Sequence, residues 1–217
     1  LLPAFDLILT TSEADAERVR RIAPQARTAV YPNALPLLPR PESTADHGPE
    51  VIAFSGNMEY HPNVTAVQFF YTRIWPELKR RRPGLVWRLI GKNEHAVRRI
   101  VANDSHVELT GAIEDPLAEL AKCRLAVVPL LAGSGTRVKI MEAWAAGKAV
   151  ASSAIGAEGL PIEDGVNIVL AEEPEQWVET VVGLLSNNEA RAALGSAGRA
   201  TYERELSWPA AWARLDA

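Results

Sequence analysis

Short apolar segments alternate with longer segments of mixed polarity along most of the chain. Six short, mainly apolar segments read as strands with both faces buried, at 51–56, 85–91, 106–111, 124–130, 148–153 and 167–171. Between and after them, apolar residues recur at helical spacing in 63–81, 94–102, 115–123, 136–147 and 174–185. This alternation predicts an α/β fold, a doubly wound, Rossmann-like parallel sheet covered by helices on both faces.

Residues that start and stop helices support these boundaries. Asp115 is expected to cap the helix at 115–123, with Pro116 at its first position, where a missing N–H costs nothing. Gly147 is a strong C-terminal signal for the helix before it. Pro76 should kink or end part of the helix at 63–81.

The first fifty residues differ from the rest. A strand, a helix and a second strand are expected at 5–10, 12–22 and 26–31, followed by a proline-rich stretch at 32–49 that reads as a linker. We therefore divide the chain into a first segment at 1–31, the linker at 32–49, the α/β domain at 50–206 and a closing helix at 207–217. Trp208 and Trp212, at helical spacing in that helix, are expected to pack in the core.

Composition argues against several classes of function. A net charge of −4, with 47% hydrophobic and 23% charged residues, lacks the basic excess of a nucleic-acid binder, so no nucleic-acid partner is expected. The single cysteine, Cys123, excludes an internal disulfide and fits a reducing compartment, which predicts a cytoplasmic protein. Four scattered histidines show no ligand spacing, and no metal site is expected. No apolar run reaches the roughly 18 residues of a membrane span.

In a doubly wound sheet, ligands lie outside the carboxyl ends of the strands. Three of the expected strands end in glycine, at Gly56, Gly91 and Gly111. Glycine at a strand end lets a ligand approach the backbone, although a tight turn alone also explains it. The loop "SGNMEYHPN" after the first of these strands also leads into a helix whose free N–H groups favour an anion.

The stretch "PLLAGSGTRVKIMEAWAAGKAV", residues 129–150, contains most of the candidate binding residues. The amides of Ser134, Gly135 and Thr136 can converge near the positive end of a helix dipole, which outlines a phosphate cradle. Arg137 and Lys139 add two cations there, which a bound dianion explains better than the alternative of two solvated surface charges.

Glu142, three residues after Lys139, has two interpretations: a surface ion pair, or a carboxylate that accepts hydrogen bonds from the diol of a ribose. The second fits a phosphate cradle, and the stretch then suits a nucleoside diphosphate. The chain has neither a Walker loop nor GxGxxG here, so ATP hydrolysis and nicotinamide chemistry are disfavoured.

Taken as a set, these motifs resemble the C-terminal, donor-binding domain of GT-B glycosyltransferases of the family 4-like group (glycosyl transferases group 1). The resemblance covers about residues 51–206, and "GSGTRVKIMEAWAAGKAVASSAIGAEGL", "FSGNMEYHPN" and "IEDPLAELAKCRLAVVPL" carry it. Upstream, "VYPNALPL" resembles the linker of these enzymes. The first segment then resembles the tail of their N-terminal acceptor domain, so the chain is expected to be part of a longer enzyme and inactive alone.

The resemblance implies a role for each motif residue. Arg137 and Lys139 would neutralise the leaving diphosphate, and Glu142 would bind the ribose hydroxyls. The cofactor-binding positions that it marks are Gly56, Asn57, Ala112, Ile113, Ser134, Gly135, Thr136 and Glu142. Ser134 stands where the family has the first of two glutamates separated by seven residues, so the donor sugar does not follow from the sequence.

The implied reaction is transfer of a sugar, with retention and without a metal or other cofactor, from a UDP- or GDP-sugar to an acceptor held by the missing N-terminal domain. Carbohydrate biosynthesis, in polysaccharide or glycoconjugate assembly, is the expectation at family level. Membrane association of the full-length protein, common among relatives, is left open. Two other functions also stay open: a non-catalytic α/β domain that binds a nucleotide or small ligand, and a nucleotide-sugar epimerase domain.

Overall fold

The computed structural model describes residues 4–11, 13–31, 33–45, 48–133 and 135–213. The chain divides into two compact units. The larger one runs from Pro39 to Thr201, and the smaller one combines the residues before and after it. The roles given to these segments by the sequence stay predictions.

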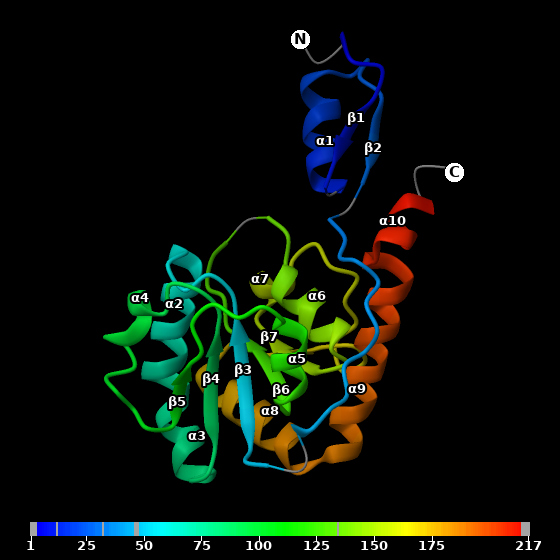
Figure 1. The fold of residues 1–217 in the computed structure, drawn as a ribbon. Coiled ribbons are helices and arrows are strands. Elements are labelled where there is room, and N and C mark those ends of the chain that lie inside the picture. The colour runs from blue at the N-terminus through cyan, green and yellow to red at the C-terminus, as the bar shows by residue number, and fades with distance from the viewer. Residues whose placement is uncertain (1–3, 12, 32, 46–47, 134, 214–217) are drawn as a thin grey trace. The chain divides into compact units, whose positions relative to one another are not determined.

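The larger unit contains a six-stranded sheet in which every pair of neighbouring strands is parallel. Its strands are β3 (Val51–Ser55), β4 (Val86–Ile90), β5 (Val107–Leu109), β6 (Leu125–Val128), β7 (Ala149–Ser152) and β8 (Val169–Leu170). Their order across the sheet is β5-β4-β3-β6-β7-β8 (Figure 1). All six fall within the expected segments, which confirms the doubly wound fold.

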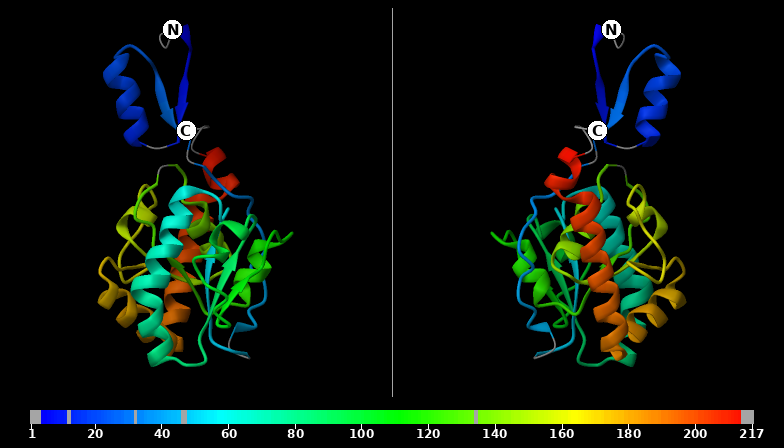
Figure 2. Two further views of the ribbon diagram at one scale, coloured as in Figure 1. Left: turned by 90° about the vertical axis from the view of Figure 1, so that its left-hand side faces the viewer. Right: turned by 90° about the vertical axis from the view of Figure 1, so that its right-hand side faces the viewer.

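Helices connect successive strands and cover both sides of the sheet (Figure 2). Their bounds are α2 (His61–Phe69), α3 (Trp75–Arg81), α4 (His95–Arg98), α5 (Pro116–Ala121), α6 (Val138–Ala145), α7 (Ala154–Ala157), α8 (Pro174–Ser186) and α9 (Asn188–Thr201). Asp115 caps α5 by accepting a hydrogen bond from the amide of Ala118 at 2.9 Å, as predicted. Gly147 follows the end of α6 with a φ of 67°, which also confirms the prediction.

Pro76 changes the winding of its helix. Between α2 and α3, residues Phe70–Ile74 form a π-helical turn, η3, and the amide of Trp75 bonds back to the carbonyl of Phe70. Proline has no N–H to continue the α-helical pattern, and a π turn is one way to absorb the lost bond. The interruption predicted at Pro76 therefore begins one turn earlier.

The two sheet faces bury different side chains. On the face packed by η3, α3 and α8, Phe70, Trp75, Trp87 and Trp177 form an aromatic cluster with ring centres 4.6–6.0 Å apart. The other core cluster contains Val51, Ala53, Ile90, Leu120, Cys123 and Ala146, from the sheet, from α5 and from the residues that follow α5 and α6. Val51 and Ala53, two residues apart on β3, thus point to the same layer, as a pleated strand requires.

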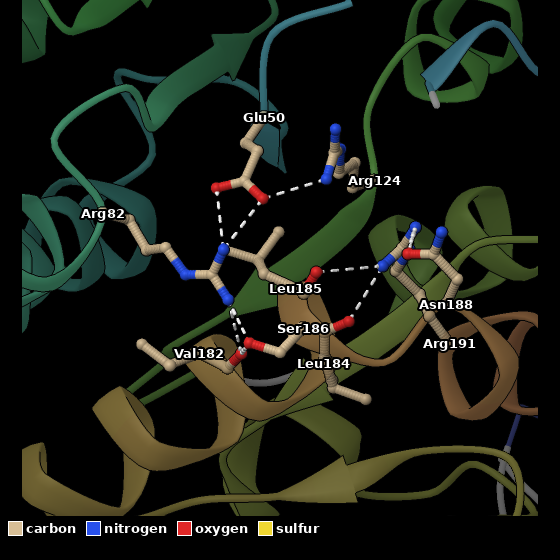
Figure 3. A network of polar contacts seen from close by, with 9 residues as sticks. All are labelled: Glu50, Arg82, Arg124, Val182, Leu184, Leu185, Ser186, Asn188 and Arg191. Atoms are coloured by element: carbon tan, nitrogen blue, oxygen red, sulfur yellow. Dashed lines mark hydrogen bonds and ion pairs between the residues drawn. The ribbon is translucent and has the colours of Figure 1, made fainter. Parts of the chain in front are cut away.

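Arginine side chains hold the C-terminal end of α8 (Figure 3). Arg82 contacts the Val182 carbonyl and the Ser186 hydroxyl, and Arg191 donates to the Leu184 carbonyl at 2.9 Å. Cations are favourable there because the last carbonyls of a helix lack partners. Glu50, just before β3, links Arg82 and Arg124 at 3.1 and 2.9 Å, so this network ties α8 to the amino end of the sheet.

The smaller unit contains a two-stranded parallel sheet of β1 (Ile8–Thr10) and β2 (Thr28–Val30), joined by α1 (Glu13–Ile22). It also contains the π-helical turn η4 (Tyr202–Leu206) and α10 (Trp208–Ala213). The core positions predicted for Trp208 and Trp212 are wrong, because these side chains are 51% and 59% exposed. Trp208 donates to the Ala34 carbonyl and Trp212 packs edge-on against Tyr31, so the helical spacing marks a local contact within this unit.

Candidate functional site

The strand order places a topological switch point between β3 and β6. From β3 the chain adds β4 and β5 on one side, and from β6 it adds β7 and β8 on the other. The loops after β3 and β6 diverge there, and ligands of doubly wound sheets bind in that crevice. These loops, at the upper edge of the sheet in Figure 1, are the two in which the sequence concentrates glycines and charges.

Two glycines allow the loops after β3 and β4 to touch. Gly91 has a φ of 137°, and a Cβ there would lie 2.0 Å from the carbonyl oxygen of Gly56. Gly56 has a φ of 144°, and its amide bonds to the carbonyl of Ile90 at 2.9 Å. No side chain fits at Gly91, so this glycine meets a need of packing beyond that of a turn.

Asparagine side chains join the same two loops. The amide of Asn93 donates to Oδ1 of Asn57 at 2.8 Å, and the amide of Asn63 donates to the backbone carbonyl of Asn57 at the same distance. Asn63, in the first turn of α2, is buried, and its Oδ1 has no hydrogen-bond partner. Asn57, one of the predicted binding residues, is thereby held from both sides.

The loop after β6 brings Arg137 to the start of α6. Arg137 is the residue immediately before the helix and is 5% exposed, so it is not one of the solvated surface charges that the sequence left as an alternative. A Cβ at Gly133 would lie 3.4 Å from its Nη1 and 3.7 Å from Pro62, so this side chain lies close to the start of α2. Gly135 has a φ of 85° and is exposed. The predicted amide donor Ser134 lies outside the described residues, and Thr136 is half-buried.

Lys139 points from the first turn of α6 to the end of β3. Its Nζ lies 5.5 Å from the ring centre of Phe54, and a Cβ at Gly56 would lie 3.7 Å from its Cε. Burial lowers the pKa of this ammonium to about 8, with Glu142 opposing the shift and Arg137 adding to it. Among the described residues, no hydrogen-bond acceptor or ion-pair partner lies within reach of it. A half-buried cation that makes no hydrogen bond within the described chain, and is compensated there by Glu142 and the Phe54 ring, favours an anionic ligand.

Glu142 lies one helical turn further on and interacts with β3. Burial raises the pKa of its carboxyl, while Lys139 and a hydrogen bond from Ser55 lower it. Ser55 itself is buried at the last position of β3. The structure therefore brings four predicted residues, Gly56, Arg137, Lys139 and Glu142, to the switch point.

Two further predicted binding residues, Ala112 and Ile113, follow β5 at the edge of the sheet. Two strands separate β5 from β6, so these residues extend the same sheet edge away from the charged residues. The side chain of Ile113 packs against the core cluster. Only the backbone of this segment can serve the role that the resemblance implies, and that role stays a prediction.

Sequence reasoning missed three residues of this region. Ser55, Asn63 and Glu158 all contact a predicted residue or its loop. Glu158, which follows α7, pairs with Arg137 at 3.0 Å. Ser55 is next to a glycine that was selected, and Asn63 is in the quoted "HPN"; nothing in the sequence connects Glu158 to Arg137 across 21 positions.

Other chemistry is limited in the described part of the chain. It contains no group of three or more His, Cys, Asp or Glu side chains able to hold a metal ion. Burial raises the pKa of the Cys123 thiol to about 11, so this side chain is not an activated nucleophile. None of the described helices has the length and apolar character needed to cross a bilayer.

Comparison with known proteins gives a consistent result. A family model described as "Glycosyl transferases group 1" matches residues 49–187, which include the sheet and the switch point. A search of curated proteins found no significant match.

Several solved structures share the fold at low sequence identity. Sucrose-phosphate synthase from Thermosynechococcus elongatus superposes with a TM-score of 0.76 at 17% identity, over 99% of this chain and 58% of that one. HepE from Anabaena, in complex with UDP and glucose, superposes with a TM-score of 0.76 at 17% identity, over 97% of this chain and 62% of that one. A variant of S. aureus TarM in complex with UDP superposes with a TM-score of 0.74 at 14% identity, over 99% of this chain and 44% of that one. The chain thus spans between 44% and 62% of the length of these proteins.

Proposed function

The chain belongs to the glycosyl transferases group 1 family, and from this premise we propose that it contains the donor-binding domain of a retaining, metal-independent glycosyltransferase. The donor is a nucleoside-diphosphate sugar with uracil or guanine as its base. The acceptor is bound by an N-terminal domain that precedes this chain in the full-length protein. A cytoplasmic location rests on the single, buried cysteine.

The observation that carries this proposal is the pair of cations at the switch point. Arg137 retains a buried Nε without a partner, and Lys139 has an ammonium over Phe54 without an acceptor in the described chain. Glu158 pairs with Arg137 and Glu142 attracts Lys139, and a bound anion would compensate the positive charge that these two carboxylates leave. A diphosphate next to the start of α6 supplies that anion and accepts from the loop amides of Gly135 and Thr136.

The same cations suit the chemical step. In the transfer, the bond between the anomeric carbon of the sugar and the diphosphate oxygen breaks, and the electron pair stays on the diphosphate. Arg137 and Lys139 stabilise the charge that grows on this leaving group, without a metal. Removing one such stabilising group typically costs about 10²- to 10³-fold in kcat. We expect Arg137→Gln or Lys139→Gln in the full-length enzyme to fall in this range.

Glu142 is assigned to the ribose. Its carboxylate, oriented by Ser55 and beside Lys139, can accept two hydrogen bonds from a vicinal diol. The pKa of this carboxyl is raised by burial, and both neighbours oppose the shift and so favour the ionised form that accepts hydrogen bonds.

Calorimetric titration of UDP and GDP, without metal, tests the assignment. The wild-type protein should bind one of the two nucleotides saturably, and Glu142→Ala should lose about 1–3 kcal/mol of that binding, the range for a charged hydrogen bond. Glu114→Ala, at an exposed acidic residue after β5, is the matched control and should bind as the wild type does. No binding of either nucleotide to the wild-type protein would contradict the proposal.

A non-catalytic nucleotide-binding domain is the competing function, since the chain covers only part of its glycosyltransferase neighbours. Transfer activity distinguishes the two. The isolated chain should bind nucleotide and release no sugar to acceptors, whereas the full-length protein should do both. A full-length protein that binds nucleotide but transfers no sugar from any donor favours the non-catalytic domain.

A further inference from the structure

Within the described chain, the guanidinium of Arg137 makes hydrogen bonds through one nitrogen, Nη2. Its Nη2 donates to Oε2 of Glu158 at 3.0 Å and to the carbonyl of Gly133 at 3.3 Å, so both hydrogens of this nitrogen are used. Nε is buried and has no partner. The Arg137 side chain is 4% exposed, whereas that of Glu158 is 73% exposed. A buried cation is thus anchored by a carboxylate that remains in water.

This anchoring determines where the remaining donors point. The guanidinium group is planar and rigid, so fixing Nη2 at two acceptors also fixes Nε and Nη1. Nη1 lies 3.4 Å from the position of a Cβ at Gly133, and Pro62 at the start of α2 lies 3.7 Å from the same position. Arg137 therefore directs its unused side toward the region between the loops after β3 and β6.

A competitor for an anionic ligand would contact Arg137 differently. A carboxylate that mimics a phosphate takes two adjacent nitrogens of the fork, which is the strongest geometry for this pair. Glu158 contacts Nη2 alone and comes from the connection after β7, on the far side of β6 from β3. It therefore supports the guanidinium from the side opposite β3 and leaves Nη1 without a partner in the described chain.

We propose that Glu158 is a positioning residue for nucleotide-sugar binding: it holds Arg137 so that Nη1 meets the donor diphosphate, without itself touching the donor. This inference rests on the proposed function. The carboxylate also balances part of the positive charge of Arg137 in the ligand-free protein, which keeps Arg137 buried and oriented before the donor arrives. Preorganisation of this kind raises affinity by lowering the cost of ordering on binding.

The test compares Glu158→Gln with Glu163→Gln, which makes the same change at an exposed acidic residue five positions further along the same connection. Calorimetric titration with UDP and GDP should show about tenfold weaker binding for Glu158→Gln and no change for Glu163→Gln. In an Arg137→Gln background, Glu158→Gln should have no further effect, because Glu158 acts through Arg137.

A second measurement is independent of nucleotide. The Nε–H of Arg137, protected by burial, should give a distinct resonance in ¹H–¹⁵N spectra of the ligand-free protein, and Arg137→Gln identifies it. Glu158→Gln should broaden or shift this resonance, and Glu163→Gln should not. A purely structural role for Glu158 would change the melting temperature and leave the coupling to Arg137 at zero.

The outcomes separate the two proposals. If the wild-type protein binds neither UDP nor GDP, the proposed function fails and the positioning role fails with it. If the wild-type protein binds and Glu158→Gln binds equally well or more tightly, only the positioning role is overturned. It is also overturned if Glu158→Gln weakens binding equally in the Arg137→Gln background.

Discussion

The ammonium of Lys139 lies 5.5 Å from the ring centre of Phe54, at the point where β3 ends and α6 begins. An aromatic face attracts a cation but provides no hydrogen-bond acceptor as strong as an anion. Lys139 thus remains charged at neutral pH in a place where its charge is only partly compensated. Nucleotide binding should therefore depend on the protonation state of Lys139.

Nucleotide affinity should fall as the pH rises above about 8. Burial lowers the pKa of Lys139 to about 8, and a bound diphosphate favours the protonated form, so binding takes up a proton above that pH. The second ionisation of a phosphate, near pH 6, is complete there. Titrations from about pH 7 to about pH 10 should show affinity falling toward tenfold per pH unit, with a much flatter profile for Lys139→Arg. Equal pH profiles would exclude Lys139 from the anion site.

The same titration affects the stability of the ligand-free protein. The unfolded chain, with a lysine pKa near 10.5, binds more protons than the folded chain between pH 8 and 10.5. The contribution of Lys139 to stability therefore rises with pH across this window. Urea unfolding at several pH values between 8 and 10.5 measures this. The free energy of unfolding should rise more steeply with pH for the wild type than for Lys139→Met.

Gly91→Ala should destabilise the fold strongly. The new Cβ would lie 2.0 Å from the carbonyl oxygen of Gly56, at a φ that L-residues rarely adopt. We expect a loss of about 3–4 kcal/mol of unfolding free energy, with weaker nucleotide binding. Gly183→Ala, in the exposed middle of α8 with nothing within 4 Å of the new Cβ, should instead stabilise by about 0.5–1 kcal/mol. Urea unfolding of both variants measures the contrast, and effects of the same sign would contradict the packing argument.

Glu50→Ala should weaken the network at the C-terminal end of α8. It leaves Arg82 and Arg124 without their shared carboxylate, and the Nε of Arg124 is already buried without a partner. Because the group is partly exposed, we expect a loss of about 1–3 kcal/mol, below that of a fully buried pair. The melting temperature should fall by roughly 5 °C, measured by calorimetry. Glu42→Ala, in the exposed proline-rich stretch, should leave it almost unchanged, and an equal fall in both variants would assign no role to the network.

Ser55→Ala should weaken nucleotide binding through Glu142. The lost hydrogen bond removes one of the two contacts that favour the carboxylate, so the pKa of Glu142 rises further. Affinity should fall by up to about tenfold, with the larger loss at acidic pH, where more of the carboxyl is protonated. Ser105→Ala, at an exposed loop position, should bind as the wild type does. A loss independent of pH would mean that Ser55 acts by packing alone.

The sequence predicted the local features of the fold well, because they depend on neighbours in the chain. The cap at Asp115, the end of α6 before Gly147 and the disturbance around Pro76 each follow from one or two residues. The alternation of strands and helices also gave the fold class. Trp208 and Trp212 were misplaced because helical spacing alone does not distinguish a core face from a partly exposed one.

The site was accessible from sequence only in part. Gly56, Arg137, Lys139 and Glu142 stand out as glycines and charges at strand ends. The switch point between β3 and β6 depends on strand order, which no local pattern encodes. The contacts of Ser55 with Glu142 and of Glu158 with Arg137 join residues 87 and 21 positions apart, so they appear only once the sheet is formed.

The aromatic cluster under the sheet has a practical consequence. Trp75 and Trp87, with ring centres 5.8 Å apart, are close enough for their electronic transitions to couple, and Phe70 packs between Trp87 and Trp177. Near-ultraviolet circular dichroism should therefore carry an exciton signal from the face of the sheet packed by α3 and α8, away from the proposed diphosphate contacts. Loss of that signal reports separation of this layer, so the chain contains its own optical probe for distinguishing a variant that cannot bind from one that cannot fold.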